Sequence, residues 1–211
     1  MRLSLLLLLG AASAIAQPFQ FGVKAGTPLT DFLNTAESGH VNYFSDTNRY
    51  IVGLTAELHL PFGLGIEVDG LYRHLNYQST STGVDAFSSA STTANAWEFP
   101  ILGKYRFRMP VVHPFIDAGV AFDSLQGVNQ AITSTVVPLV PSHSTTSNPV
   151  ELHHKTTHGY VVGGGVDIHL LVIHIMPEIR YTRWNAEHFF DPNGLLHSNV
   201  NQGEFLLGIT F

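Results

Sequence analysis

Apolar and polar residues alternate with a period of two in eight separate segments of the chain. Such alternation is typical of β-strands that have one apolar and one polar face, because successive side chains of a strand point to opposite sides. The sequence therefore predicts eight strands of about nine to fourteen residues. They span residues 18–27, 49–60, 64–76, 95–107, 113–125, 158–170, 172–184 and 203–211.

The connections between these segments alternate between short and long. Residues 61–63, 109–112 and 170–171 form short turns, whereas residues 28–48, 77–94, 126–157 and 185–202 form long loops. Short turns at one rim and long loops at the other are typical of an up-and-down barrel in an outer membrane, where the long loops face outward. The loops at 77–94 and 126–157 are rich in Ser, Thr and Asn, which predicts mobile segments that do not pack into a core.

Charged side chains gather on one face of the eight predicted strands, while the opposite face is apolar. In the last strand, for example, Phe205 and Leu207 point one way and Glu204 points the other. An Arg or Lys on the lipid side of a barrel costs about 2–4 kcal/mol near the middle of the membrane, so in a membrane the charged face is the inner one. The predicted polar network of the lumen consists of Lys24, Glu57, Glu67, Asp69, Arg73, Glu98, Lys104, Arg106, Asp117, Asp123, Asp167, Glu178, Arg180 and Glu204.

A soluble, lipocalin-like barrel has the same number of strands but places its apolar face inside, around a ligand. Alternation alone does not distinguish the two. Aromatic side chains of the apolar face gather at its two ends. Phe19, Tyr105, Phe107 and Phe211 fall at the short-turn end, and Tyr50, Tyr72, Trp97, Phe122, Tyr160, Tyr181 and Phe205 fall at the long-loop end. Two aromatic belts match the interfacial girdles of membrane barrels, which favours the membrane-spanning alternative.

The last predicted strand closes with alternating apolar residues and a final Phe: Phe205, Leu207, Ile209 and Phe211. This ending resembles the signal that the barrel-assembly machinery reads in the small OmpA-like outer-membrane β-barrel proteins of Gram-negative bacteria. The stretch Arg-Tyr-Thr-Arg-Trp at 180–184 also resembles that group. The resemblance implies an all-β, eight-stranded antiparallel barrel in contact with outer-membrane lipid and lipopolysaccharide. It implies no single activity, since relatives serve as structural anchors, adhesins or narrow pores.

The N-terminus has the three parts of a secretory signal peptide: Arg2, an apolar run at 3–9, and a small-residue stretch that ends at Ala16. The apolar run is shorter than the roughly 20 residues that a transmembrane helix needs. We therefore expect a cleaved signal peptide at residues 1–16, one barrel domain at residues 17–211, and export to the cell outer membrane.

Composition excludes several classes of partner and site. The chain contains no Cys, so neither a disulfide framework nor a thiolate metal site is available. Only 12% of the residues are charged, the formal net charge is −6, and no basic cluster occurs. Nucleic acid is therefore not expected as a partner, because its phosphates would find no cluster of Lys and Arg.

The predicted lumen contains nine acids and five bases, in an interior just wide enough for side chains to fill. Because buried charges need partners, we expect an ion-paired plug rather than an open channel. Six apolar residues also fall on the inner side: Ile51, Leu71, Leu75, Leu102, Phe115 and Met176. The favoured function is a structural protein that displays its long loops, with adhesion to an extracellular ligand. A narrow pore that prefers cations, made by the surplus acids, is the alternative.

Two prolines lie within predicted strands, Pro100 and Pro177. A closed barrel has no edge strand on which a missing N–H is harmless, so we expect β-bulges at both positions.

Catalytic and metal sites have weaker support in the sequence. His197 and Ser198 superficially resemble the His and Ser of lipid A deacylases, but they are adjacent in a loop and no residue at a suitable spacing orients the base. A lipid A-modifying enzyme is therefore the least favoured hypothesis. The longest loop and its end contain four histidines, His143, His153, His154 and His158. A flexible loop offers no rigid ligand geometry, so we predict a solvated cluster and no catalytic residue, cofactor or metal site.

Overall fold

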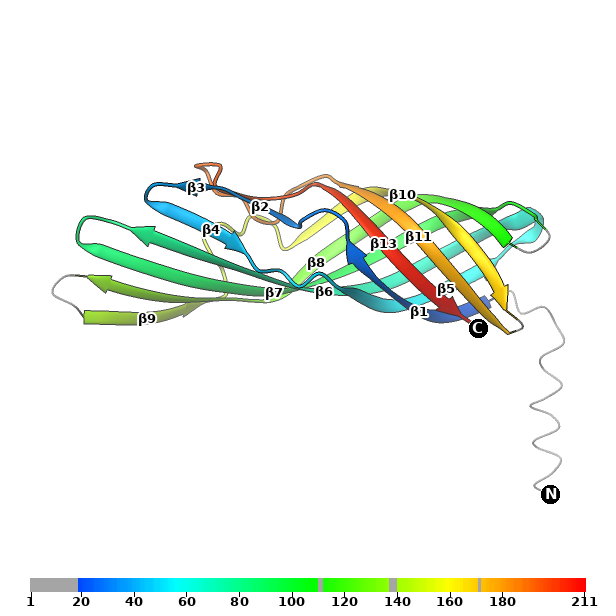
Figure 1. Ribbon diagram of the computed structural model, residues 1–211, viewed down its shortest axis with the longest axis horizontal. Coiled ribbons are helices and arrows are strands. Elements are labelled where there is room, and N and C mark those ends of the chain that lie inside the picture. Colours follow the sequence, from blue (N-terminus) through cyan, green and yellow to red (C-terminus); the bar gives the residue numbers. More distant parts are fainter. Residues whose placement is uncertain (1–18, 110–111, 137–139, 171) are drawn as a thin grey trace, which may run out of the picture.

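The computed structural model describes residues 19–109, 112–136, 140–170 and 172–211. The expected signal peptide lies outside these residues. The described chain is an elongated all-β molecule with a closed barrel at one end and long hairpins at the other (Figure 1). Within the described residues, no helix is long and apolar enough to cross a membrane.

Eight antiparallel strands close the barrel, as the alternation predicts. Each pairs with its neighbours in the order β1-β5-β6-β7-β8-β10-β11-β13, and β13 pairs back with β1. The ladder that closes the ring includes Val23 opposite Ile209. The strands are β1 Phe19–Pro28, β5 Ile51–His59, β6 Leu64–Thr82, β7 Ala86–Arg106, β8 Val112–Val136, β10 Thr156–Leu170, β11 Ile173–Trp184 and β13 Asn201–Thr210.

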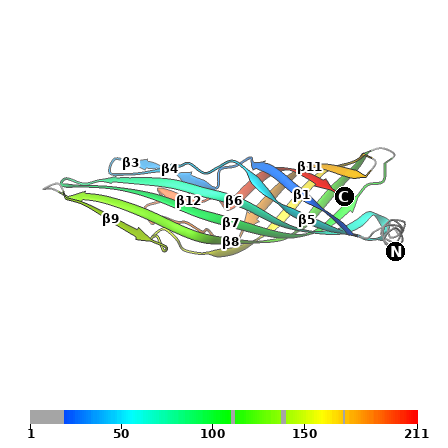
Figure 2. The ribbon, with the colours of Figure 1, turned by 90° about the horizontal axis from the view of Figure 1, so that it is seen from below.

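The long-loop end is not a set of mobile loops, and that expectation is wrong. The strands β6, β7 and β8 continue far beyond the barrel, and three short strands join them: β3 Glu37–Ser38, β4 Val41–Ser45 and β9 Val140–Thr146. Together they form an open antiparallel sheet in the order β3-β4-β6-β7-β8-β9, which we call the extended sheet (Figure 2). Thr is a good strand former, and the outer part of this sheet, residues 78–82 and 86–89, has no buried side chain. It needs no apolar alternation, so its composition suits a strand as well as a loop.

Shorter elements complete the two ends. At the long-loop end, β2 Leu33–Thr35 pairs with β12 Leu196–Ser198 in a separate two-stranded ribbon. At the short-turn end, β5 and β6 are joined by one 3₁₀ turn, η2, over Pro61–Gly63. Phe62 and Gly63 in this turn both have positive φ, 68° and 84°. Such a tight connection fixes the register of the two strands that it joins.

The strand prolines do not cause bulges, contrary to expectation. The β6–β7 ladder keeps one register on both sides of Pro100, and the β10–β11 ladder keeps one register on both sides of Pro177. Pairing is only interrupted there, because a missing N–H removes a ladder bond without inserting a residue. Among the described ladders, the register shift lies between Thr93 and Asn95, where β7 leaves the barrel for the extended sheet.

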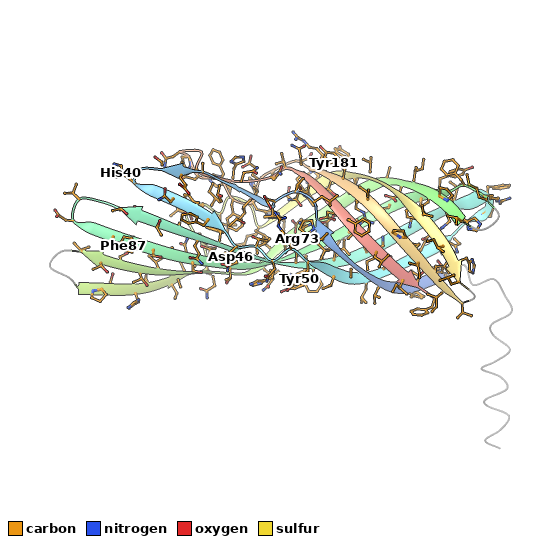
Figure 3. The ribbon with its side chains drawn as sticks, viewed as in Figure 1. His40, Asp46, Tyr50, Arg73, Phe87 and Tyr181 are labelled. Carbon is orange, nitrogen blue, oxygen red and sulfur yellow. The ribbon has the colours of Figure 1, made fainter. Side chains whose placement is uncertain are left out.

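The outer surface of the barrel is apolar. Phe21, Leu54 and Ile179 are 62%, 68% and 61% exposed, whereas the charged side chains of the same strands point inward. A lipocalin-like arrangement would reverse the two faces, so the structure contradicts that alternative. Figure 3 shows Tyr50 and Tyr181 on opposite sides of the molecule near the middle of its long axis, at the level of the predicted aromatic belt, and Phe87 far beyond it on the extended sheet.

Candidate functional site: the charged lumen and the extracellular cap

The inner face of the barrel holds the residues of the predicted polar network. Thirteen of the fourteen are buried, and Arg106 is half-buried at the short-turn end. Strand alternation places them there, because each occupies the face opposite the exposed apolar residues of its own strand.

Lys24 and Arg180 form the centre of the network. Lys24 Nζ donates to Glu178 Oε2 at 2.9 Å and to Asp69 Oδ2 at 3.1 Å, and it is also paired with Glu67. Arg180 donates through Nε to Glu178 Oε1 at 2.7 Å and through Nη2 to Asp69 Oδ2 at 2.9 Å. These five side chains come from three strands, β1, β6 and β11, and are fully buried, so the network ties separate walls of the barrel together.

Two smaller groups lie on either side of this centre. Toward the short-turn end, Arg106 is bound to Glu57 and donates through Nε to Asp167 Oδ2 at 3.1 Å. Toward the long-loop end, Arg73 bridges Glu98 and Glu204, with an Nη2–Oε2 distance of 2.9 Å to Glu98. Each base is therefore shared between at least two acids, which the surplus of acids in the lumen requires.

Two predicted residues have a different environment from the rest. Lys104 pairs with Glu67 and Glu57 and also lies over the ring of Phe115, with Nζ 4.3 Å from its centroid. Asp117 is cross-strand to Lys104, yet both of its carboxylate oxygens are buried without a hydrogen-bond partner in the described structure. The expectation that the lumen charges pair therefore fails at Asp117.

Asp123 meets a residue that the sequence did not suggest. Its Oδ2 lies 3.1 Å from Nε2 of His188, and both residues are buried. His188 belongs to the segment 185–202, which has no strand alternation, so no period in the sequence points to it. Nδ1 of His188 lies 2.7 Å from the carbonyl oxygen of His154. The histidine thus connects the lumen to the long loops.

Apolar side chains fill the rest of the lumen. Ile51, Leu71 and Leu206 form one buried cluster, and Leu102 packs with Trp184 in another. Phe115 and Met176 are also buried. The barrel is therefore packed by apolar groups between its ion pairs.

A third apolar cluster lies outside the barrel and covers its long-loop mouth. We call this structure the cap. Phe189 is fully buried there, with its ring 5.3 Å from that of Tyr77, and Tyr43 Oη donates to Glu151 Oε1 at 3.1 Å. The buried side chains of the cap are Phe32, Leu33, Tyr43, Leu75, Tyr77, Ala94, Ala96, Leu125, Val128, Phe189 and Leu196. They come from segments far apart in sequence, and sequence reasoning missed their association.

Burial changes the chemistry of Tyr43 in the cap. Removal from water raises the pKa of Tyr43 well above its usual value, and the negative charge and hydrogen bond of Glu151 raise it further. The neutral phenol is the form that donates to the carboxylate. The contact between these two side chains therefore holds loop 28–48 against the segment that follows β9.

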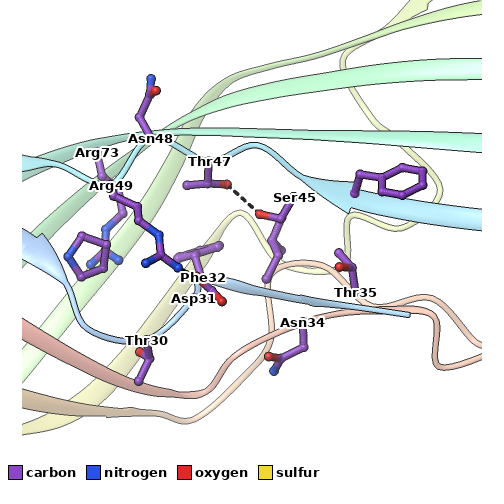
Figure 4. A pocket seen from close by; sticks show the side chains of 13 residues that line it. Thr30, Asp31, Phe32, Asn34, Thr35, Ser45, Thr47, Asn48, Arg49 and Arg73 are labelled. Carbon is purple, nitrogen blue, oxygen red and sulfur yellow. Dashed lines mark hydrogen bonds and ion pairs between the residues drawn. The ribbon is translucent and has the colours of Figure 1, made fainter. Parts of the chain in front are cut away.

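The cap contains a polar pocket of about 500 Å³. Figure 4 shows it between the segments 28–35 and 44–49, with Arg73 and Phe32 at its inner side. The guanidinium of Arg73 lies 5.6 Å from the centroid of the Phe32 ring, and Arg49 is paired with Asp31 at the exposed rim. Hydroxyl and amide side chains line most of the remainder, together with Pro28, Leu33 and Phe44, so the pocket suits a small ligand that is mainly polar.

Residues 15–183 match the family model described as outer membrane protein beta-barrel domain. The chain belongs to this family. OprG, an outer membrane protein of Pseudomonas aeruginosa, has the same fold: the TM-score is 0.53 at 14% identity, over 91% of this chain and 92% of that one. Neisserial surface protein A, NspA, aligns with a TM-score of 0.46 at 15% identity, over 92% and 96% of the two chains. No curated protein matches the chain in sequence.

Membership of the outer-membrane β-barrel family fixes the orientation of the sites. The molecule is located in the outer membrane, and the resemblance to small outer-membrane barrels is confirmed. In barrels of this kind, the short turns face the periplasm and the long connections face outward. The extended sheet and the cap are therefore extracellular.

The residues considered for catalysis do not form a catalytic pair. His197 and Ser198 are consecutive on β12, so their side chains point to opposite faces of the ribbon. Ser198 is buried, and its Oγ accepts a hydrogen bond from the backbone N–H of Phe189 at 3.0 Å. His197 Nε2 lies 3.3 Å from Nδ2 of Asn34. In this outer-membrane barrel, both side chains hold the cap together.

The four loop histidines are not brought to one point. His143 lies on β9 beside Thr133, whereas His158 Nε2 is 2.8 Å from Nδ2 of Asn185. The rings of His153 and His154 are 6.5 Å apart. In the part of the chain that the structure describes, no group of three or more His, Asp or Glu side chains is placed to hold a metal ion.

Proposed function

We propose that this outer-membrane barrel is a surface-display protein: a sealed membrane anchor that presents a folded extracellular surface to a ligand outside the cell. The observation that carries the proposal is the contrast between the two ends of one set of strands. Inside the membrane they enclose a packed, ion-paired lumen, and outside it they continue as an ordered sheet with a capped mouth. Binding surfaces held on a rigid scaffold are where proteins of this architecture carry function.

The uncharged β8–β9 side of the extended sheet supports recognition of a protein or glycan partner. Residues 127–150 contain no Asp, Glu, Lys or Arg, and β9 pairs with β8 on one side only. An edge strand without charges offers backbone N–H and C=O groups to another extended chain. The polar pocket of the cap provides a second surface for a small ligand or a sugar. No catalytic step is part of this function.

Assembly into the membrane is proposed to use the last strand. On β13, Phe205 and Leu207 are 39% and 40% exposed on the lipid side, and Phe211 just after it is 68% exposed. Together with Ile209 they present the alternating apolar face that the barrel-assembly machinery would read. The lipid-facing surface would contact outer-membrane lipid and lipopolysaccharide after export directed by a signal peptide at 1–16.

Asp117 favours a second candidate function, a narrow pore that prefers cations. Its two unpartnered oxygens are the kind of group that a passing cation could meet. Single-channel recordings in planar bilayers distinguish the two functions. We expect no conductance steps above background from the wild-type protein. Conductance steps that are selective for cations, and that are smaller in the Asp117→Asn variant, would establish the pore instead.

The display function itself is tested on whole cells. Cells that express the wild-type protein should bind to some members of a panel of immobilised glycans and extracellular-matrix proteins. A variant in which Ser142 and Ser144 of β9 become Lys should keep the barrel but lose partners that add a strand to this edge. A variant with the pocket residue Asn48→Trp, aimed at the other surface, is the matched comparison. If neither wild type nor variants bind above cells without the protein, the display proposal is wrong.

A further inference from the structure

The periplasmic mouth of the barrel gathers histidines that come from separate strands. A pocket of about 530 Å³ at this mouth is lined by His59, His113, His169 and His174, together with Arg106 and Asp167. Each histidine lies at the periplasmic end of its strand and on the inward face, by the same alternation that places the lumen charges. Four imidazoles thus share one concave surface outside the central network.

His169 and His174 form the closest pair of this group. They are directly opposite each other on β10 and β11, one step from the hairpin between these strands. Their ring centroids are 3.9 Å apart, with planes inclined by 46°. His169 is exposed to the pocket, whereas the side chain of His174 is only 13% exposed. A rigid ladder therefore holds two imidazoles side by side at a place that ions from the periplasm can reach.

His174 is oriented by a buried carboxylate. Its Nδ1 lies 2.9 Å from Asp167 Oδ1, and the other oxygen of Asp167 accepts a hydrogen bond from Arg106 Nε at 3.1 Å. Metal-ligating histidines commonly donate one ring N–H to a carboxylate, which fixes the tautomer and leaves the second nitrogen as the ligand. The Asp167 contact leaves Nε2 of His174 available in this way.

We propose that this mouth binds one divalent transition-metal ion of the zinc, copper or nickel class, with His169 and His174 as protein ligands. Neutral imidazole suits these metals, and the absence of oxygen ligands from the histidine pair disfavours calcium and magnesium. Asp167 is a positioning residue, and water completes the coordination. A two-histidine site agrees with the finding that no group of three candidate ligands surrounds one point in the described chain.

The charges around the pair permit a bound cation. Glu57 and Asp167 balance Arg106, which is paired with both. His59 Nε2 lies 3.3 Å from Glu57 Oε1. His113 on β8 lies opposite Asp167 on β10. Arg108 also lines the pocket. Among the described residues that line the pocket, Arg108 is the one Arg or Lys without an acidic partner named here, and it is exposed.

Metal titration of the untagged full-length protein in detergent tests the proposal. Isothermal titration with Zn²⁺ should give one site, and the Cu²⁺ electron paramagnetic resonance spectrum should show coupling to two imidazole nitrogens. His169→Gln with His174→Gln should weaken Zn²⁺ binding at least tenfold. Asp167→Asn should weaken it by roughly 10- to 100-fold, as loss of an orienting partner does. His153→Gln with His154→Gln, the extracellular pair whose rings are 6.5 Å apart, is the control.

The outcome that overturns the site is equal binding by the wild type and the His169/His174 double variant, or no binding by either. Loss of binding in the His153/His154 variant alone would move the metal to the extracellular side and also contradict the proposal. Gel mobility before and after boiling checks that each variant is folded. If the double variant does not fold, His169→Gln alone gives the same test, because this exposed ring supports no contact of the central network.

Discussion

The lumen and the extended sheet share strands β6, β7 and β8 but differ in their charged side chains. Within the barrel, β6, β7 and β8 carry Glu67, Lys104 and Asp117, all of them buried. Beyond the barrel, the stretch 127–150 that includes the end of β8 and all of β9 contains no acid, Lys or Arg. The lumen depends on charges that must find partners, whereas the extended sheet depends on backbone pairing and on neutral side-chain contacts such as that of Ser88 with Ser134.

This difference governs how each region responds to change. A buried ion that loses its partner remains in a medium that solvates it poorly, so one substitution affects several residues. In the outer part of the extended sheet, where no side chain is buried, water can replace a lost side-chain contact. We therefore expect the free energy of unfolding to depend strongly on the lumen and weakly on the sheet, with the cap between them.

The largest effect is expected at the centre of the lumen. Arg180→Met removes the shared partner of Glu178 and Asp69, and this should lower the free energy of unfolding by about 3–5 kcal/mol, since it leaves buried carboxylates uncompensated. Urea unfolding in lipid vesicles, followed by gel mobility, measures it. Arg183→Met is the matched control, because Arg183 is exposed three residues further along β11. Equal losses in the two variants would contradict the network.

The cap should show the next largest effect. Phe189→Ala removes a fully buried ring and should destabilise the cap by about 3 kcal/mol, the lower end of the range for such truncations. Segments 28–48 and 185–202 should then be cleaved faster by added protease, while the urea midpoint of the barrel stays near the wild-type value. Phe190→Ala at the neighbouring, 39% exposed position should leave cleavage unchanged. Barrel unfolding together with the cap would show that the two are one unit.

Alkaline pH should loosen the cap by a smaller amount. The pKa of Tyr43 is raised in the folded protein, so its contribution to stability is complete below the ordinary pKa of a tyrosine, about 10. It is lost as the pH rises from there toward the folded pKa, because the unfolded cap ionises first. Cleavage of segment 28–48 should therefore increase between pH 9 and pH 11. Tyr43→Phe should reduce this increase and cost about 1.5 kcal/mol at neutral pH, the lower end of the range for a hydrogen bond to a charged group.

The smallest effect is expected on the edge of the extended sheet. Ser142→Lys and Ser144→Lys place charges on the exposed strand β9 and should change the free energy of unfolding by no more than about 0.5 kcal/mol. Urea unfolding measured beside Arg180→Met gives the comparison directly. A loss of 2 kcal/mol or more would mean that the sheet supports the barrel, contrary to the contrast drawn between them.

Sequence patterns located the barrel better than what lies outside it. All eight barrel strands were predicted, because apolar alternation is imposed by lipid on one side and a packed lumen on the other. The same alternation is missing at the outer ends of the strands, where no side chain is buried, so the sequence predicts a loop where β6 continues to Thr82 and β8 continues to Val136. The missing information is long-range strand pairing, which no local period encodes.

The sites divide in the same way. The inward position of Glu67 or Arg180 follows from strand phase, but which base meets which acid depends on the barrel's radius and register. The cap depends on contacts such as that of Tyr77 with Phe189, which are more than a hundred residues apart. No pattern in the sequence predicts these contacts. The periplasmic histidines did have one: His169 and His174 both fall at the short-turn ends of predicted strands and share the inward phase.

The length of β8 sets how far from the cell the protein can act. This strand has 25 residues, and a membrane-spanning strand needs about 9–11. About 14 residues therefore remain beyond the lipid, which is on the order of 45 Å of extended chain before allowance for tilt. Under the proposed display function, a partner could engage the tip without touching the bilayer. The hairpins would then act as a stalk, and shortening them would change access to a partner without altering the barrel.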